Sequence, residues 1–163
     1  MIDSDRFKQA MRRLAGGVNI VTSHDESGPL GITATAVTSL SCEPASVLCC
    51  INQSSALERA IRAEGTFGIN VLRSEHVGLA RRFAGMGGIA GAARFDVGLW
   101  ERTSHRAPTL ADSLVALQCE LVEVVEAHTH SVFIGNIAEV LLGDSGEPLV
   151  YCDGSFSRLE AIA

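Results

Sequence analysis

The chain has 163 residues, of which 47% are hydrophobic and 20% charged, and its formal net charge is −6. This length and composition predict one folded domain over residues 1–163, without long disordered segments. Lys8 is the only lysine, so the chain lacks the basic stripe typical of nucleic-acid binding. The N-terminal segment is charged and has no long apolar stretch, so we expect a cytoplasmic protein with neither a signal peptide nor a membrane span.

The cysteines and histidines argue against disulfides and metals. The five cysteines are odd in number and form no C-x-x-C motif, which indicates free thiols. A catalytic thiol is possible but has no support from the pattern. His128 and His130 would share one face of a strand, yet two histidines supply too few ligands for zinc. We therefore predict no metal site.

The first predicted elements are a helix and a strand. Phe7, Met11 and Leu14 form a helical stripe that ends at Gly16 and Gly17. A strand over residues 18–22 follows, and the polar residues 24–29 predict a turn.

The next segment, residues 31–41 (GITATAVTSLS), is predicted to be a single strand. With a period of two, one face is small and mostly apolar and the other is rich in hydroxyl groups. Small side chains let a flat ligand approach the backbone, where hydroxyl and N–H groups can bind its polar edge. The alternative is an ordinary amphipathic edge strand.

A strand over residues 47–51 leads into a second predicted helix. Ser55 and Glu58 form a capping-box pattern, and Gly65 supplies the C-terminal stop. The N–H groups of such a helix, together with the hydroxyls of Ser54 and Ser55, could hold a phosphate. Most capping boxes, however, only stabilise their own helix.

The rest of the chain predicts a mainly β fold with short helices. We expect a strand over residues 66–72 and a helix capped by Ser74, which ends in the glycine-rich residues 83–91. Three further strands are predicted, over residues 114–125, 132–142 and 149–152. Short helices beside mostly antiparallel strands suggest a barrel.

The glycine-rich loop also contains a false dinucleotide motif. Gly85, Gly87 and Ala90 match G-x-G-x-x-A, but that motif needs a strand before it and a helix after it. Here a predicted helix precedes the glycines, so we reject a Rossmann fold.

Seven segments in order resemble the short-chain flavin reductase family. They are GGVNIVTS, GITATAVTSLS, SVLCCINQSS, FGINVL, LARRFAGMGGIAGAARF, HTHSVFIGNI and PLVYCDGSF. The FAGM segment with Arg94 and Phe95 most resembles reductase components of two-component monooxygenases, such as those acting on 4-hydroxyphenylacetate or in pyrimidine degradation.

This resemblance implies a homodimeric split β-barrel of the FMN-binding type, with FMN or FAD as cofactor and NADH or NADPH as co-substrate. The residues expected to line the isoalloxazine ring and ribityl chain are Thr33, Ala34, Thr35, Ala36 and Val37. Asn52, Ser54 and Ser55 are expected at the ribityl chain and phosphate. His130 corresponds to a family histidine near the nicotinamide, and Tyr151 lies on the strand flanking the dinucleotide site.

The chain departs from the family pattern at two places. His128 and Thr129 stand where the family often has Gly or Gly-Asp, and Ser155 and Ser157 flank Phe156 where a basic residue and a histidine are frequent. These departures leave open the choice between NADH and NADPH.

The implied reaction is hydride transfer from the nicotinamide to the flavin, which then leaves for a partner monooxygenase. The cofactor carries the redox chemistry while the protein orients the two rings. His130 would position the carboxamide or relay a proton; otherwise it is a hydrogen-bonded surface histidine. The alternatives are a non-catalytic flavin-binding or electron-carrying split barrel, and an oxidase resembling pyridoxamine phosphate oxidases, whose phosphate sites use arginines and lysines.

Overall fold

The computed structural model describes residues 2–103 and 106–162. Its helices are α1 (Ser4–Met11), α2 (Ala56–Glu64) and α3 (Val77–Phe83), with 3₁₀ turns η1 (Ser74–His76) and η2 (Gly91–Asp96). Its first six strands are β1 (Gly16–Gly17), β2 (Asn19–Asp25), β3 (Gly28–Ala34), β4 (Val37–Cys42), β5 (Ala45–Asn52) and β6 (Thr66–Val71). The others are β7 (Trp100–Thr103), β8 (Arg106–Leu110), β9 (Val115–Ala127), β10 (His130–Leu142), β11 (Leu149–Cys152) and β12 (Ser155–Arg158).

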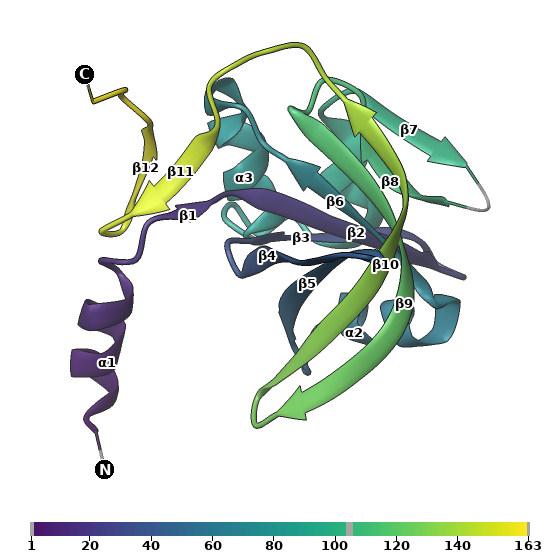
Figure 1. Ribbon diagram of the computed structural model, residues 1–163, viewed down its shortest axis with the longest axis horizontal. Helices are drawn as coiled ribbons and strands as arrows, with labels where there is room; N and C mark the ends of the chain where they lie inside the picture. The colour runs from purple at the N-terminus through teal and green to yellow at the C-terminus, as the bar shows by residue number, and fades with distance from the viewer. Residues whose placement is uncertain (1, 104–105, 163) are drawn as a thin grey trace.

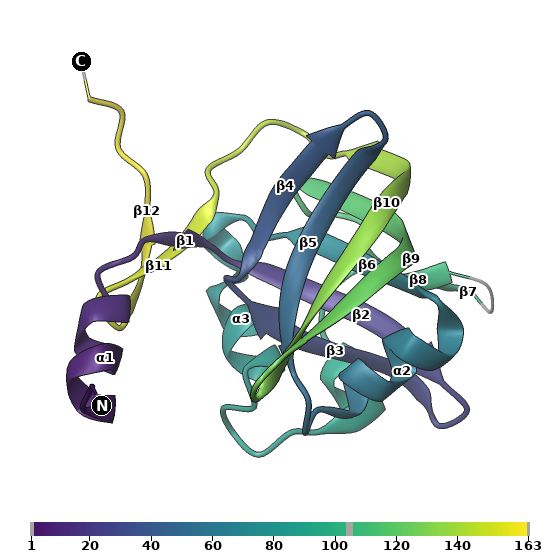
Figure 2. The same cartoon turned by 60° about the horizontal axis from the view of Figure 1, so that its bottom comes forward.

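Seven strands form one curved sheet in the order β3-β2-β6-β9-β10-β5-β4. All of its strand pairs are antiparallel, as predicted. Figures 1 and 2 show the sheet curling into a barrel with α2 and α3 outside it. The outermost strands, β3 and β4, are consecutive in sequence, so the chain crosses the open side of the barrel between them.

That crossing makes the prediction of one strand over residues 31–41 wrong. The chain bends at Thr35 and Ala36, where the amide of Val37 donates to the carbonyl of Thr35 at 2.9 Å. Ala36 then accepts from the amide of Cys50 at 3.0 Å, which ties the bend to β5. The period-two sequence pattern continues through the bend, so it does not reveal that the segment contains two strands. β3 pairs with β2, whereas β4 pairs with β5.

Two buried clusters support the barrel. One lies inside the sheet and includes Phe67, Ile69 and Phe133, all fully buried. The other lies beneath α3, where Phe83, Phe95 and Trp100 pack edge to face or tilted with ring centroids 4.8 to 5.2 Å apart. A Cβ on Gly31 would lie 2.8 Å from the Phe83 ring, so β3 can approach these aromatics only with glycine there.

The N-terminal helix stands apart from the barrel, whereas β11 joins the cluster beneath α3 through the buried Leu149. Figures 1 and 2 show α1 beside the small sheet β1-β11-β12. The predicted stripe of Phe7, Met11 and Leu14 is exposed, and α1 buries no residue. The helical pattern is therefore confirmed over part of the segment, but its apolar face joins neither buried cluster of the described residues.

In the second half of the chain the predicted strands are confirmed, but the predicted helix cap at Ser74 is wrong. β6, β9, β10 and β11 match their predicted positions within a few residues. Ser74 opens the 3₁₀ turn η1 and donates to Glu75, whereas α3 begins only at Val77. The glycine-rich loop follows the helix α3 and not a strand, as predicted, so its context is not that of a Rossmann motif. Within residues 2–103 and 106–162, no helix is long and apolar enough to cross a membrane.

Candidate functional site

The N-terminus of α2 is built much as predicted. Ser55 is its N-cap, and its hydroxyl accepts a hydrogen bond from the amide of Leu57 at 3.2 Å. Gly65 ends the helix in the left-handed conformation with φ of 68°. The second hydrogen bond of a capping box, from the Ser55 amide to the Glu58 carboxylate, is not formed. The Ser55 amide donates instead to the carbonyl of Asn52 at 3.0 Å.

The residues before the helix form a closed turn. The side-chain oxygen of Asn52 accepts from both the amide and the hydroxyl of Ser54, at 2.9 and 2.7 Å. Such an Asx turn fixes the approach of the chain to the helix. The structure therefore brings together the three predicted residues Asn52, Ser54 and Ser55.

A cavity of about 300 Å³ lies against this helix end. Its lining residues come from β3, the start of α2 and the glycine-rich loop: Leu30, Gly31, Ile32, Ser55, Ala56, Leu57, Ala90, Gly91 and Arg94. The unpaired N–H groups and positive dipole of a helix N-terminus favour an anion. Arg94 adds a guanidinium group to the same wall, so the cavity suits a negatively charged group.

Arg94 also fixes the walls of this cavity to one another. Its Nε donates to the carbonyl of Ile89 at 3.0 Å, and its Nη1 donates to the carbonyls of Gly31 and Phe83 at 2.9 and 3.2 Å. Among the described residues, Nη2 has no hydrogen-bond partner. Sequence reasoning named Arg94 only as part of a segment that resembles the family. Its role in this cavity was not predicted, because its three hydrogen-bond partners come from separate parts of the chain.

The predicted residues Thr33 to Val37 span the bend between β3 and β4. Thr33 is half-buried and its hydroxyl donates to the carbonyl of Ala80 at 2.7 Å. Thr35 lies beside β1, since a Cβ on Gly16 would be 3.0 Å from the Cβ of Thr35. Val37 lines a second, mostly apolar cavity of about 290 Å³ at the barrel mouth. Ala34 is half-buried and Ala36 is exposed, and both side chains are small.

His130 lies next to the predicted phosphate site. It pairs directly with Asn52 across β10 and β5, and opposite residues have Cβ atoms about 4.5–5.5 Å apart. Its ring nitrogen Nδ1 contacts the hydroxyl of Thr129 at 2.9 Å, and its carbonyl accepts from the side chain of Gln53 at 3.3 Å. The ring itself is exposed.

The expectation that His128 and His130 share a strand face is wrong. β9 ends at Ala127, which pairs with His130. His128 therefore lies in the hairpin turn, with φ of 55°. Within the described residues, no group of three or more histidine, cysteine or acidic side chains could hold a metal ion.

Tyr151 lies on the small sheet at the other side of the bend. It pairs with Gly16, the glycine that adjoins Thr35, and its ring contacts Phe156 with centroids 5.2 Å apart. The guanidinium of Arg81 lies 5.9 Å from the centre of the Phe156 ring. Tyr151 and His130 thus lie in different sheets. The Thr33–Val37 segment lies between Gly16, which pairs with Tyr151, and β5, which pairs with the strand of His130.

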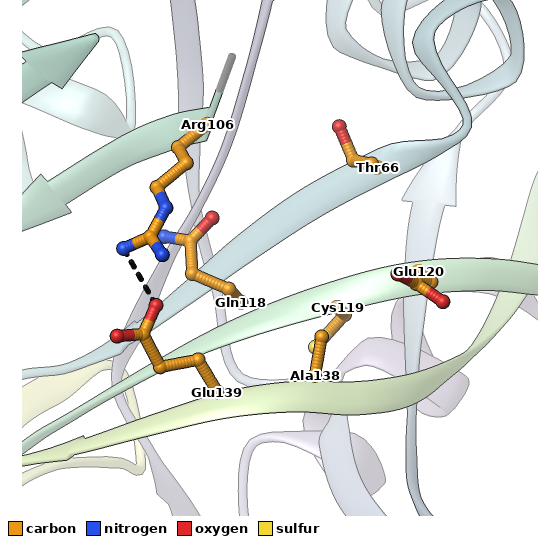
Figure 3. Close-up of a pocket in the computed structure, with 7 residues that line it drawn as sticks. All are labelled: Thr66, Arg106, Gln118, Cys119, Glu120, Ala138 and Glu139. Carbon is orange, nitrogen blue, oxygen red and sulfur yellow. Dashed lines mark ion pairs between the residues drawn. The ribbon is translucent and has the colours of Figure 1, made fainter.

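A third cavity, of about 420 Å³, lies away from all the predicted residues. Figure 3 shows it between β6, β8, β9 and β10, with Arg106 directed toward Glu139. The two side chains form an ion pair at 2.6 Å. Because this carboxylate already neutralises the guanidinium, the cavity is less suited to an anion than the one at α2.

The buried cysteines are not nucleophiles. Burial raises the pKa of the Cys49 thiol far above its ordinary value and that of Cys119 to about 12. Both thiols stay protonated at neutral pH, and a protonated thiol is a poor nucleophile.

Glu58 forms a charged network behind the helix end. Burial raises the pKa of its carboxyl, but hydrogen bonds from Arg62 and Ser131, at 2.6 and 2.8 Å, together with the nearby charges, leave that pKa below the ordinary value. Ser131 is fully buried. Because the fold favours the ionised carboxylate, this network stabilises the protein above the ordinary pKa, and the contribution is lost as the pH falls through the lowered one.

Replacing Ser131 with alanine is expected to lower the free energy of unfolding by about 1–3 kcal/mol at neutral pH, because a buried carboxylate loses one donor. The loss should shrink as the pH falls and Glu58 becomes protonated. Urea unfolding at several pH values measures it, with the exposed Ser157 changed to alanine as control. A loss independent of pH would mean that the hydroxyl does not act through the Glu58 charge.

A family model described as "Flavin reductase like domain" matches residues 11–160. The chain belongs to the flavin reductase family. The 4-hydroxyphenylacetate 3-monooxygenase reductase component of Escherichia coli is 38% identical over 146 residues, which cover 90% of this chain and 86% of that protein. The FMN reductase (NADH) RutF of Variovorax paradoxus is 32% identical over 155 residues, covering 95% of this chain and 85% of that protein.

A solved structure of this flavin reductase family has the same fold. NADH:FAD oxidoreductase SgcE6 of Streptomyces globisporus C-1027, in complex with NAD and FAD fragments, has a TM-score of 0.87 at 25% identity, covering 98% of this chain and 96% of that one. The predicted split β-barrel with short helices is confirmed. These matches concern whole chains, and the roles of individual side chains stay predictions.

Proposed function

We propose that this protein is an NAD(P)H-dependent flavin reductase that supplies reduced flavin to a partner monooxygenase. The observation that carries the proposal is the cavity where the N-terminus of α2, its cap Ser55 and the guanidinium of Arg94 converge, in a chain of the flavin reductase family. The relatives' names support it, since they include monooxygenase reductase components and an FMN reductase (NADH). They give no support to a non-catalytic carrier.

The residues present fit a phosphorylated flavin. The free N–H groups of α2, the Ser55 hydroxyl and Arg94 would hold the phosphate of FMN or FAD. Asn52 and Ser54, whose hydroxyl and amide donate to Asn52, would hold the turn in place. The small residues of the Thr33–Val37 bend would leave room for the ring system against the backbone. When bound, the flavin accepts a hydride from the nicotinamide and supplies the electrons that the partner uses.

The nicotinamide donor would approach between the exposed ring of His130 and the small sheet with Tyr151. His130 would orient the carboxamide, with Thr129 fixing the ring through Nδ1. Tyr151, packed against Phe156, would flank the dinucleotide. Hydride transfer needs the two rings stacked and aligned, so these side chains act by positioning.

The partners would be a monooxygenase and a second copy of the chain. A homodimer is supported by large apolar side chains exposed on one hairpin and a nearby strand: Leu40, Val122, Val125, Val140, Leu141 and Leu142. Exposed apolar surface of this kind commonly marks an interface. The unpaired thiols and the nicotinamide co-substrate fit the reducing environment of the cytoplasm.

The purified protein is expected to oxidise NADH when FMN or FAD is added. Nicotinamide absorbance gives the rate, flavin fluorescence gives binding in the same preparation, and NADPH is tested in parallel. Flavin added to NADH without protein is the control. Flavin binding without NADH oxidation would favour the non-catalytic carrier, and no binding of any flavin would contradict the proposed site.

A further inference from the structure

Glu58 places a carboxylate in the first turn of the helix whose N-terminus is the proposed phosphate site. It lies three residues after the cap Ser55, and side chains so spaced are about 5–6 Å apart at Cβ. A carboxylate in the first turn stabilises the helix dipole. The same charge would repel a phosphate bound at that helix end, so its pairing matters for anion binding.

The structure directs this carboxylate away from the helix end. The partner it would have in a capping box, the Ser55 amide, is occupied by the carbonyl of Asn52. Glu58 instead accepts from Nε of Arg62 at 2.6 Å and from the hydroxyl of Ser131 at 2.8 Å. Its side chain is only 7% exposed, so solvent screens its charge poorly and the guanidinium provides most of the neutralisation.

Arg62 is shared between two carboxylates. Its Nη2 lies 3.3 Å from Glu126 of β9, whose side chain is 73% exposed. The guanidinium also lies 5.9 Å from the centre of the Phe133 ring, which fixes its position over the barrel. Arg59 is the other cation that acts on Glu58, but it forms no ion pair with Glu58. Removing Arg62 would therefore leave a buried carboxylate unpaired behind the phosphate site.

We propose that Arg62 determines the preference of the site for phosphorylated flavins by neutralising Glu58. This inference rests on the proposed function, which puts the flavin phosphate at the N-terminus of α2. Arg62 is a positioning residue: it lies behind the helix end, and it acts on the ligand through the charge and direction of Glu58. The ligand class it favours is FMN or FAD over riboflavin, which has no phosphate.

The test compares the dissociation constants of FMN and riboflavin, measured by flavin fluorescence without NADH. Changing Arg62 to methionine is expected to weaken FMN binding about three- to tenfold. This is the effect expected of one uncompensated negative charge, that of Glu58, about 10 Å from the phosphate. Riboflavin binding should change less than about twofold on the same reasoning, because riboflavin is uncharged. Adding Glu58→Gln to Arg62→Met should restore FMN binding, since the repelling charge is gone.

Two further variants control for the fold. Glu126→Gln removes the exposed partner of Arg62 and should leave FMN binding unchanged. Glu58→Gln alone keeps Arg62 and should leave FMN binding unchanged or tighter, and it remains a test if Arg62→Met does not fold. Thermal unfolding of each variant shows whether it is folded at the assay temperature.

Equal weakening of FMN and riboflavin by Arg62→Met would overturn the inference, since Arg62 would then act through the fold. So would unchanged FMN binding in that variant, or weaker FMN binding in Glu58→Gln alone. If the unmodified protein binds FMN no more tightly than riboflavin, the phosphate site itself is wrong, and the inference fails with it. A preference for FMN in the unmodified protein that is undiminished in Arg62→Met would reject only the role of Arg62.

Discussion

Changing Arg94 to alanine is expected to lower the free energy of unfolding by about 3 kcal/mol, because each hydrogen bond from a charged donor is worth about 1.5–3 kcal/mol and the losses are not additive. Three carbonyls lose their donor, and those of Gly31 and Phe83 belong to buried residues. The same variant should bind FMN about 10–100-fold more weakly, since a cation beside the phosphate is removed. Urea unfolding and flavin titration measure the two effects separately.

Arg94→Lys separates charge from geometry. A lysine keeps the positive charge but lacks the planar fork that reaches several carbonyls at once. We therefore expect Arg94→Lys to recover part of the FMN affinity while remaining as unstable as the alanine variant. Arg102→Ala, at an exposed arginine of β7, is the matched control. Normal FMN affinity in a folded Arg94→Ala protein would remove this residue from the phosphate site.

Local patterns predicted the elements whose boundaries are set by nearby residues. The cap at Ser55 and the stop at Gly65 depend on hydrogen bonds and conformation within one helix, and both are confirmed. The long strands β9 and β10 follow from runs of Val, Leu and Ile. Short helices beside antiparallel strands suggested a barrel, and the resemblance to the flavin reductase family specified it as a split β-barrel.

Features set by distant contacts were missed. The bend at Thr35 and Ala36 exists because β3 and β4 join opposite edges of the sheet, and nothing in the alternation over residues 31–41 marks it. The hairpin of β7 and β8 was not predicted, since residues 100–110 are largely polar and pack through long-range contacts such as the bond from Gln118 to Ala107. Residues 104 and 105 of that hairpin lie outside the described residues.

The two groups of predicted site residues lie closer than their separation in sequence indicated. His130 was expected near the nicotinamide and Asn52 at the ribityl chain and phosphate, yet they are direct partners across β10 and β5. The Asn52 side chain is held by Ser54, and the His130 ring by Thr129. Gln53 joins the two segments by hydrogen bonds to the carbonyls of Thr129 and His130. The imidazole itself contacts the Thr129 hydroxyl and not the Asn52 turn, so it can be removed without disturbing the turn before α2.

Changing His130 to alanine is accordingly expected to slow the reduction of bound flavin by NADH about 10–100-fold, which corresponds to roughly 1.4–2.7 kcal/mol of lost orientation. Flavin affinity should stay within about twofold of the unmodified protein, because no helix-end donor is lost. Stopped-flow reduction of prebound flavin measures the first quantity and fluorescence titration the second.

The control is His128→Asn at the neighbouring histidine. His128 has φ of 55° in the hairpin turn, and asparagine tolerates that conformation better than alanine does, so the hairpin should be kept. We expect His128→Asn to reduce flavin at nearly the normal rate. If His128→Asn is slow while His130→Ala is normal, the two histidines exchange roles. If His130→Ala instead loses flavin affinity, the imidazole belongs to the phosphate end of the site, beside Asn52, and another group orients the nicotinamide.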